Sequence, residues 1–325
     1  MKLGVLGGGA WGTALAQVAA RGDEPVTLWA REDEVVAAIN HAHENRLFLA
    51  GVPLAASIRA TGDLATLDDC DALLVVVPAQ FLRTVLSAAP VAGRPLVLCA
   101  KGIEAGTRML VAEIARERHP DAPVAVLSGP TFAHEVARGL PTAVTLACED
   151  EALRDRLAAR LAGPAFRTYG SSDVIGAEIG GAVKNVLAIA CGVVEGAGLG
   201  LNARAALIAR GFAEMTRFGI ARGGRAETLA GLSGLGDLVL TCSSTNSRNF
   251  SLGVGLGRGE RAADLLADRR TVAEGAATAP VLRDAARAAG VDMPVTDAVC
   301  MLLDGAAVGD VVDALLSRPL REEGA

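Results

Sequence analysis

The sequence predicts an α/β domain with a doubly wound parallel sheet, followed by an all-α domain. The chain has 325 residues, which is more than a single hydrophobic core usually holds. Its first half alternates short β-rich runs with helical stretches, and these runs lack the polar alternation of a half-exposed strand, so both faces of the sheet are expected to be covered. The β-rich runs stop at about Ser171, so we expect the domains to span residues 1–171 and 172–325.

The expected elements follow one another along the chain, with glycine or proline at most junctions. Six runs are expected to be strands: KLGVLG (2–7), PVTLWA (25–30), ALLVVVP (72–78), PLVLCA (95–100), PVAVLSG (123–129) and TAVTLAC (142–148). Helical stretches between them include WGTALAQVAARG (11–22) and TRMLVAEIARERH (107–119). The second half is expected to form helices at 173–195, 203–222, 262–266, 279–289, 296–303 and 310–316, and the last residues, REEGA (321–325), to be disordered.

Composition excludes several classes of protein. The net charge is −6 and there is no basic stripe, which argues against nucleic acid as a partner. The longest uncharged apolar run near Lys184, residues 186–194, is far shorter than the roughly 20 residues that cross a bilayer, so no membrane span is expected. The glycine-rich start is typical of a folded strand rather than a secretory signal, which favours the cytoplasm. The C-x-x-C spacing is missing, so neither a metal site nor a disulfide framework is expected from Cys70, Cys99, Cys148, Cys191, Cys242 and Cys300.

A G-x-G-x-x-G motif joins the first strand to the first helix, with Gly7, Gly9 and Gly12 in VLGGGAWGTALA. The first glycine permits a tight turn, the second lets the backbone approach a pyrophosphate, and the third allows close helix packing. Glycine-rich turns are common, but here strand, turn, helix and second strand all fall within the first 30 residues. This context is typical of a Rossmann-type dinucleotide-binding domain.

The second strand ends at Arg31, where an NAD site usually carries an acidic residue for the ribose 2′-hydroxyl. An arginine suits a 2′-phosphate, so the sequence favours NADPH as cofactor, with NADH possible. Glu32 and Asp33 follow immediately, and they either cap the next helix or alter the choice of cofactor. A solvated surface role for Arg31 stays an alternative.

Polar groups gather where strands of the first domain end and in one glycine-rich segment of the second domain. Lys101 follows one strand directly, and Gly129, Thr131 and Ala133 follow the next, at the carboxyl edge where open α/β sheets bind ligands. Segment 231–259 is unusually rich in glycine and short polar residues for a helical bundle, and an arginine beside hydroxyl and amide groups suits a bidentate grip on phosphate. The candidates in this segment are Asp237, Ser247, Arg248 and Asn249.

Lys184 lies alone inside IGGAVKNVLAIACGVV (179–194), an apolar, alanine-rich helical stretch. Two of its neighbours one turn away are Gly180 and Gly181, so another group can approach the ammonium. We expect Lys184 to point into the cleft between the domains and to give a proton to a substrate carbonyl as hydride arrives, because partial burial lowers the pKa of a lysine toward neutrality. A structural role, with the ammonium reaching water or pairing with a carboxylate, stays open.

The chain resembles the bacterial NAD(P)H-dependent glycerol-3-phosphate dehydrogenases over nearly its whole length. The resemblance is carried by GGGAWGTALA, AKGIE, SGPTFAHEVARGLPTA, GGAVKNVLAIACG, NARAALIARGFAEM, GLSGLGDLVLTCSSTNSRNFSLG, VAEGAATAPVL and MPVTDAV. Among relatives with the same two-domain plan, KNVLAIACG, GLGDLVLTC and SRNFSLG in this order are specific to the family. The resemblance implies a Rossmann-type domain and a helical domain like the C-terminal domain of 6-phosphogluconate dehydrogenase. It also implies reduction of dihydroxyacetone phosphate to sn-glycerol 3-phosphate for phospholipid synthesis.

The same resemblance implies roles for individual residues. Lys184 would be the proton donor or acceptor, Lys101 would contact cofactor and substrate, and Asp237 would orient the ammonium or the substrate hydroxyl. The other substrate contacts would be Gly129 and Thr131, with Ser247, Arg248 and Asn249 as the phosphate-binding group. The cofactor contacts would be Gly7, Gly9, Ala10, Trp11, Gly12, Arg31, Phe48, Lys101, Ala133, Arg248 and Glu274. The chain departs from many relatives at two positions. Glu195 replaces an aspartate, and Ala10 replaces a residue with a hydroxyl group. The second departure implies the loss of one hydrogen bond to the cofactor, which contributes about 1 kcal/mol.

Two other functions remain open at this point. A related dehydrogenase acting on a β-hydroxyacid would need a site for a carboxylate and would have no need of the NSRN segment (246–249). A regulatory protein that senses NADPH without turnover would have no use for Lys184 and Asp237 together. The assembly is also left open, with a homodimer as one possibility.

Overall fold

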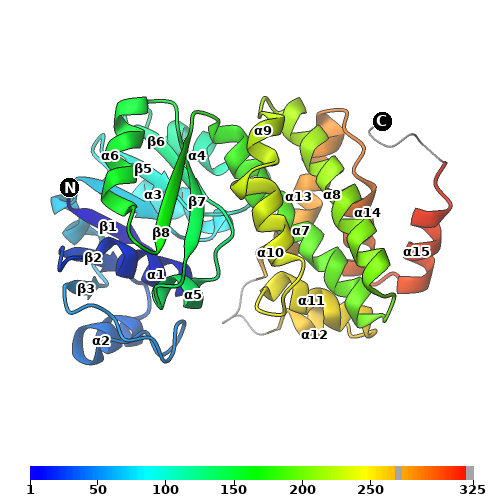
Figure 1. Ribbon diagram of the computed structural model, residues 1–325, viewed down its shortest axis with the longest axis horizontal. Helices are drawn as coiled ribbons and strands as arrows, with labels where there is room; N and C mark the ends of the chain where they lie inside the picture. The colour runs from blue at the N-terminus through cyan, green and yellow to red at the C-terminus, as the bar shows by residue number, and fades with distance from the viewer. Residues whose placement is uncertain (268–272, 320–325) are drawn as a thin grey trace. The chain divides into compact units, whose positions relative to one another are not determined.

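The computed structural model describes residues 1–267 and 273–319, so the segment REEGA (321–325), expected to be disordered, lies outside the described residues. The chain divides into two compact units. Unit 1 comprises Met1–Lys101 and Leu110–Ala177, and unit 2 comprises Gly102–Met109 and the described residues from Glu178 onward. Figure 1 shows a sheet covered by helices in unit 1 and helices alone in the main part of unit 2. The division falls near residue 177, where 171 was expected, and the short segment 102–109 belongs to unit 2 although residues on both sides of it in the sequence belong to unit 1.

Unit 1 contains one mixed sheet, in which the strand order is β3-β2-β1-β4-β5-β6-β7-β8. All neighbouring pairs are parallel except β6 and β7, which are antiparallel. The strands are β1 (Leu3–Leu6), β2 (Val26–Trp29), β3 (Ile58–Thr61), β4 (Ala72–Val75), β5 (Leu96–Leu98), β6 (Val124–Ser128), β7 (Thr142–Cys148) and β8 (Phe166–Ser171). From β1 the chain first adds β2 and β3 on one side of the sheet, and it then crosses to the other side of β1 to add β4 to β8. The predicted doubly wound sheet is therefore confirmed.

The sheet differs from the prediction in its two edge strands and in the direction of β7. Strands β3 and β8 were not predicted, because an edge strand has only one neighbour and tolerates exposed polar residues, such as Arg59 in β3. The helix between β6 and β7 is α5 (Ala133–Ala137), which rises only about 7.5 Å. Strand β6 is about 17 Å long, so this connection does not carry the chain back along the sheet, and β7 runs antiparallel to it.

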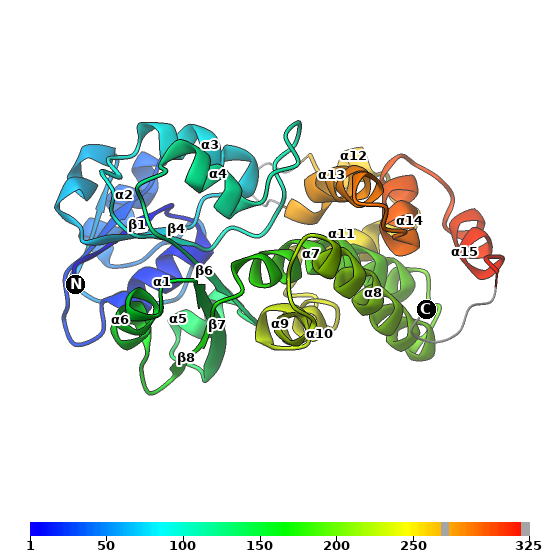
Figure 2. The same cartoon turned by 90° about the horizontal axis from the view of Figure 1, so that it is seen from above.

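Helices cover both faces of the sheet. Helices α5 and α6 pack against α1 on one face, and α3 and α4 pack together on the other (Figure 2). The central strands β1 and β4 are buried along their whole length, as their unbroken apolar sequences predict. Besides α5, the helices are α1 (Ala10–Ala19), α2 (Asp33–Ala42), the 3₁₀ turn η1 (Leu64–Asp69), α3 (Ala79–Ala88), α4 (Val111–Arg118) and α6 (Glu151–Leu161).

Unit 2 is built around α7 (Val174–Gly196), whose glycines bring other backbones close. A Cβ on Gly192 would lie 2.1 Å from the carbonyl oxygen of Phe250, and one on Gly196 would lie 2.2 Å from that of Val254. Only glycine therefore allows this crossing of α7 with α11 (Arg248–Gly257). The remaining helices are α8 (Leu201–Ala221), α9 (Ala226–Leu229), the π-helical turn η2 (Leu232–Gly236), α10 (Asp237–Thr241), α12 (Ala262–Leu265), α13 (Glu274–Ala288), α14 (Pro294–Leu303) and α15 (Val308–Leu316).

Helix α7 is the one described helix that is long and apolar enough to cross a membrane. However, 94% of its most apolar window is buried inside the protein, which is typical of the core helix of a globular domain. The expectation of 173–195 for this helix agrees with its observed bounds within one residue at each end. The glycine-rich segment 231–259, for which no helix was expected, forms η2, α10 and α11.

Candidate active site

The turn between β1 and α1 has the geometry that each motif glycine predicts. Gly7 has φ of +127°, which side-chain-bearing residues rarely adopt. A Cβ on Gly12 would lie 1.9 Å from the carbonyl oxygen of Gly7, so only glycine lets α1 pack this closely on the turn. Among the described residues, no heavy atom lies within 4 Å of a Cβ built on Gly9, so its backbone faces open space. The turn therefore fits an approaching pyrophosphate.

Other predicted cofactor contacts of unit 1 surround this turn. Ala10 and Trp11 form the first turn of α1, and the buried indole Nε1 of Trp11 has no hydrogen-bond partner among the described residues. Ala133 begins α5, which packs on α1. An unpartnered buried donor beside an open glycine turn is a further sign that a polar ligand fits here. Phe48 lies half-buried in the segment after α2 and packs against the core of unit 1.

Arg31 follows β2 and is exposed, with its guanidinium 2.9 Å from the Glu32 carboxylate. Glu32 occupies the N-cap position of α2, but its side chain makes no capping hydrogen bond. The Glu32 carboxylate therefore pairs with Arg31 and does not cap the helix, whereas its effect on the choice of cofactor stays a prediction. A 2′-phosphate on Arg31 would compete with this pairing.

Lys101, Gly129 and Thr131 meet at the carboxyl edge of the sheet, beyond β5 and β6. The Lys101 ammonium donates to the carbonyl oxygen of Gly129 over 3.1 Å, and the Thr131 hydroxyl donates to the same oxygen over 3.2 Å. A Cβ on Gly129 would lie 3.0 Å from the Cα of Val144, and its φ of +156° favours glycine. The chain thus brings together all three of these predicted substrate contacts in unit 1.

Lys184 of α7 is buried, with only 6% of its surface exposed. Its ammonium donates to the Asp237 carboxylate over 2.6 Å and to the Thr241 hydroxyl over 2.9 Å. Asp237 is completely buried, and the Thr241 hydroxyl in turn donates to the backbone oxygen of Asp237 over 2.6 Å. Lys184 therefore has a fixed orientation beside a fully desolvated counter-ion.

The small residue Gly180, one turn before Lys184, lets another segment come near, as expected. A Cβ on Gly180 would lie 2.4 Å from the carbonyl oxygen of Ser233 and 2.8 Å from the Cα of Gly234. Gly180 thus admits the backbone of η2, and this contact places Asp237, the residue after η2, against the ammonium. A π-helical turn is a rare conformation that occurs frequently at functional sites.

The structure adds two residues that were not predicted: Thr241, which bonds to Lys184, and Asn185, the next residue of α7, which belongs to a second polar network. Asn185 accepts a hydrogen bond from the Asn249 side chain over 3.0 Å, and Asn249 accepts one from the backbone N–H of Gly275 over 2.9 Å. Two sequence signals were available. Asn185 adjoins Lys184, and Thr241 follows Asp237 by four residues, which places both side chains on one helix face.

The three predicted phosphate contacts differ in their burial and in the hydrogen bonds that their side chains make within unit 2. The buried Ser247 caps α11, because its hydroxyl accepts from the backbone N–H of Phe250 over 3.2 Å. Asn249 is buried in the amide network described above. Arg248, the first residue of α11, is exposed, and its side chain makes no hydrogen bond or ion pair with any described residue. Glu274, a predicted cofactor contact, is half-buried and begins α13 beside Gly275.

The six cysteines are free and buried, as the absence of a disulfide pattern predicts. The Cys191 thiol hydrogen-bonds to Cys242, and together with burial this raises the pKa of Cys242 well above its ordinary value. Burial also raises the pKa of Cys99 to about 12. These thiols are therefore poor nucleophiles. Among residues 1–267 and 273–319, no three His, Cys, Asp or Glu side chains cluster in a way that would hold a metal ion.

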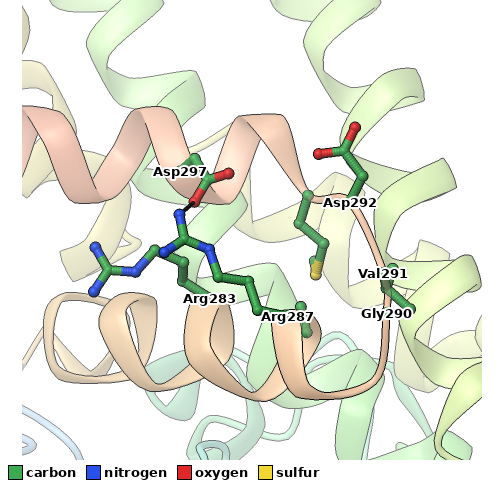
Figure 3. A pocket seen from close by; sticks show the side chains of 8 residues that line it. Arg283, Arg287, Gly290, Val291, Asp292 and Asp297 are labelled. Carbon is green, nitrogen blue, oxygen red and sulfur yellow. Dashed lines mark hydrogen bonds and ion pairs between the residues drawn. The ribbon is translucent and has the colours of Figure 1, made fainter.

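Unit 2 also has a cavity of about 260 Å³ at the junction of α13 and α14 (Figure 3). Arg283, Arg287, Asp292 and Asp297 line it, together with apolar atoms of the connecting turn. Arg287 donates to Asp297 over 2.9 Å, and Arg283 donates to Asp284 over 3.1 Å, so the charges on its wall are largely compensated. None of the predicted site residues lines this cavity.

Comparisons with known proteins match both units of the chain. The family model of the NAD-dependent glycerol-3-phosphate dehydrogenase N-terminus matches residues 2–154, and the model of the C-terminus matches residues 173–312. The glycerol-3-phosphate dehydrogenase (NAD(P)+) 1 of Sphingopyxis alaskensis is 66% identical over 324 residues, which cover 99% of this chain and 98% of that protein. The corresponding enzyme of Erythrobacter litoralis is 63% identical over 322 residues, with coverage of 99% and 98%.

A solved structure leads to the same family. The crystal structure of glycerol-3-phosphate dehydrogenase from Coxiella burnetii superimposes with a TM-score of 0.92 at 38% identity, covering 98% of this chain and 99% of that one. The matches extend over the glycine turn of unit 1 and over the Lys184 and Asp237 pair of unit 2. The chain belongs to the family of NAD(P)+-dependent glycerol-3-phosphate dehydrogenases.

Proposed function

We propose that this chain reduces dihydroxyacetone phosphate to sn-glycerol 3-phosphate, the backbone of phospholipids, with NADPH as cofactor and NADH possible. The family and the names of its relatives support this activity. The single observation that carries the catalytic assignment is the buried ion pair of Lys184 and Asp237, braced by Thr241. The nicotinamide supplies the hydride when the cofactor is bound.

Lys184 is the proposed proton donor to the carbonyl oxygen of the substrate. Asp237 holds the ammonium in place over 2.6 Å, and Thr241 fixes a second N–H direction. When the proton leaves, the fully buried Asp237 carboxylate loses its counter-charge, which is costly in a desolvated site. The amine therefore regains a proton after each turnover, which restores the pair. In the reverse reaction, proton transfer from the substrate hydroxyl to the amine would restore the pair in the same way.

Arg248 is the proposed anchor for the substrate phosphate. It is exposed and uncommitted, and it stands at the first position of α11, where unpaired backbone N–H groups and the helix dipole also favour an anion. Ser247 and Asn249 shape this helix end through the hydrogen bonds described above. In unit 1, Lys101, Gly129 and Thr131 are proposed to contact the substrate, because they converge at the carboxyl edge of the sheet.

The glycine turn is proposed to hold the pyrophosphate, with Gly9 facing it and Arg31 facing the 2′-phosphate. The other cofactor contacts proposed are Gly7, Ala10, Trp11, Gly12, Phe48, Lys101, Ala133, Arg248 and Glu274. Because Glu32 competes for Arg31, we expect preference for NADPH over NADH to be modest. A cytoplasmic location and a homodimer complete the proposal.

A β-hydroxyacid dehydrogenase and a regulatory sensor of NADPH are the alternatives. An uncommitted arginine at a helix N-terminus suits a phosphate dianion better than a small carboxylate, and the buried Lys184–Asp237 pair has no role in a sensor. These observations favour the phosphorylated ketone as substrate and turnover as the activity.

The test is a steady-state assay with dihydroxyacetone phosphate, run with NADPH and NADH in parallel. Lys184→Ala is expected to lower kcat by about 10²- to 10⁴-fold, the usual contribution of a general acid, while Kd for NADPH stays unchanged. Lys2→Ala, which removes a partly exposed lysine that lies 3.8 Å from the Asp69 carboxylate in unit 1, is the control. Near wild-type turnover of Lys184→Ala would remove the catalytic assignment, and wild-type protein without activity on dihydroxyacetone phosphate would remove the function.

A further inference from the structure

Asn45 is a completely buried polar residue that is not among the predicted site residues. It lies in the segment after α2, far from the glycine turn in sequence. Its side-chain NH₂ group donates one hydrogen bond to the carbonyl oxygen of Gly8 over 2.9 Å and another to the Thr13 hydroxyl over 2.8 Å. The Thr13 hydroxyl donates in turn to the Gly8 oxygen over 3.4 Å. These three groups close a ring inside the turn between β1 and α1.

The ring fixes the direction of the Gly8–Gly9 peptide. None of the described peptide bonds is cis, and in a planar trans peptide the C=O and the following N–H point in opposite directions. Because Asn45 and Thr13 hold the Gly8 oxygen inward, the Gly9 N–H points outward. No described residue accepts a hydrogen bond from this N–H. It faces the side on which a Cβ of Gly9 would find open space.

Asn45 also joins this turn to a second predicted cofactor contact. Its side-chain oxygen accepts a hydrogen bond from the backbone N–H of Phe48 over 3.1 Å. One side chain therefore holds the glycine turn with its donors and the Phe48 segment with its acceptor. Of the common side chains, only an uncharged amide offers two donors and an acceptor on one short group. An aspartate would place a second acceptor against the Gly8 oxygen in a site without water.

The geometry points to Asn45 as a positioning residue that pre-orients the Gly9 N–H and the Phe48 segment for the dinucleotide, an inference that rests on the proposed use of NADPH. The ring orders the turn before the cofactor binds, so less conformational entropy is lost on binding. It therefore affects cofactor affinity and not the chemical step. Asn45 touches neither cofactor nor substrate in this scheme.

The experiment compares Asn45→Ala with Asn40→Ala. Asn40 is a matched control because its side chain also makes two hydrogen bonds inside unit 1, both to the backbone of Ala60, and does not reach the glycine turn. Kd for NADPH is measured by nicotinamide fluorescence, and amide hydrogen exchange follows residues 7–13 in the protein without cofactor. Asn45→Ala is expected to raise Kd for NADPH about tenfold, the equivalent of one net hydrogen bond, and to speed exchange in the turn. Its kcat at saturating NADPH and its KM for dihydroxyacetone phosphate are expected to stay within about twofold of wild type.

The outcomes separate this inference from the proposed function. Unchanged Kd in Asn45→Ala, or an equal rise in Asn40→Ala, overturns the positioning role, whereas wild-type protein that does not bind NADPH overturns the proposed function itself. If Asn45→Ala fails to fold, Thr13 offers the same test at another corner of the ring. Thr13→Val removes the hydroxyl and is expected to raise Kd, and Thr13→Ser restores it and is expected to bind NADPH as wild type does; equal affinity in the two variants overturns the inference.

Discussion

Glu214 gives unit 2 a stability that depends on pH near neutrality. It lies on α8 and is only 2% exposed. Its carboxylate accepts hydrogen bonds from the backbone N–H groups of Val295 over 2.7 Å and of Thr296 over 3.4 Å, at the start of α14. Burial raises the pKa of Glu214 from 4.5 to about 7, although the bonds from Val295 and Thr296 and the charge of Arg217 act to lower it, and the charge of Asp292 raises it.

The sign and size of the effect follow from this pKa. The folded protein holds the proton more tightly than the unfolded chain, so the stabilising contribution is complete below pH 4.5 and is lost as pH rises through 7. Each pH unit between these values corresponds to about 1.4 kcal/mol. The difference between 4.5 and about 7 therefore gives about 3 kcal/mol for the whole range.

The perturbation is Glu214→Gln, which keeps the shape of the side chain and does not titrate. At pH 4.5 the variant and the wild type are expected to have similar free energies of unfolding, because both carry a neutral group. By pH 7.5 the variant is expected to be more stable than the wild type by up to about 3 kcal/mol. Urea unfolding followed by far-UV circular dichroism measures the difference, since both tryptophans, Trp11 and Trp29, lie in unit 1 and their fluorescence does not report on α8.

The control is Glu260→Gln, which removes an exposed carboxylate from the same unit and is expected to change stability by less than about 0.5 kcal/mol. A Glu214→Gln difference that stays constant between pH 4.5 and 7.5, or that favours the wild type as pH rises, would refute the reasoning. Such a result would mean that the pKa of Glu214 in the folded protein is not raised above its value in the unfolded chain.

Two further substitutions test the parts of the site in unit 2. Gly180→Ala places a Cβ 2.4 Å from the backbone of Ser233, so η2 and Asp237 must shift. The kcat is expected to fall at least about tenfold, while Kd for NADPH stays unchanged. The control is Gly309→Ala, at an open helical position, which is expected to keep the wild-type kcat. Wild-type kcat in Gly180→Ala would contradict this. Arg248→Ala is expected to raise KM for dihydroxyacetone phosphate at least about tenfold, whereas Arg258→Ala, at the other end of α11, leaves it unchanged. An unaltered KM in Arg248→Ala would place the phosphate elsewhere.

The sequence was sufficient to predict the central part of the sheet and the long helices, because burial on both faces leaves unbroken apolar runs. The runs of β1 and β4, for example, contain no polar side chain and are buried throughout. Edge strands such as β8, with its exposed Tyr169, carry no such pattern. The direction of β7 depends on the length of α5, a boundary that residue patterns define poorly.

For the site, the sequence indicated which residues carry chemistry but not which residues hold them. Lys184 was conspicuous because a charge inside an apolar helix is costly, and the composition of segment 231–259 pointed to Asp237 and Arg248. Thr241 and Asn45, by contrast, are ordinary polar residues in sequence and become informative only when their partners are known. The roles of the predicted residues remain predictions until the variants above are measured.

In each unit, close backbone approach at a glycine makes one part of the predicted site sensitive to an added side chain. In unit 1, Gly12 lets α1 reach the carbonyl of Gly7, and in unit 2, Gly180 lets η2 reach α7. In both places the neighbour is backbone, which has no alternative rotamer and yields only if a whole segment moves. A single added methyl group at Gly180 therefore acts on the Lys184–Asp237 pair without touching either side chain. The position of the proposed acid is thus determined as much by the missing side chain one turn away as by the carboxylate that it contacts.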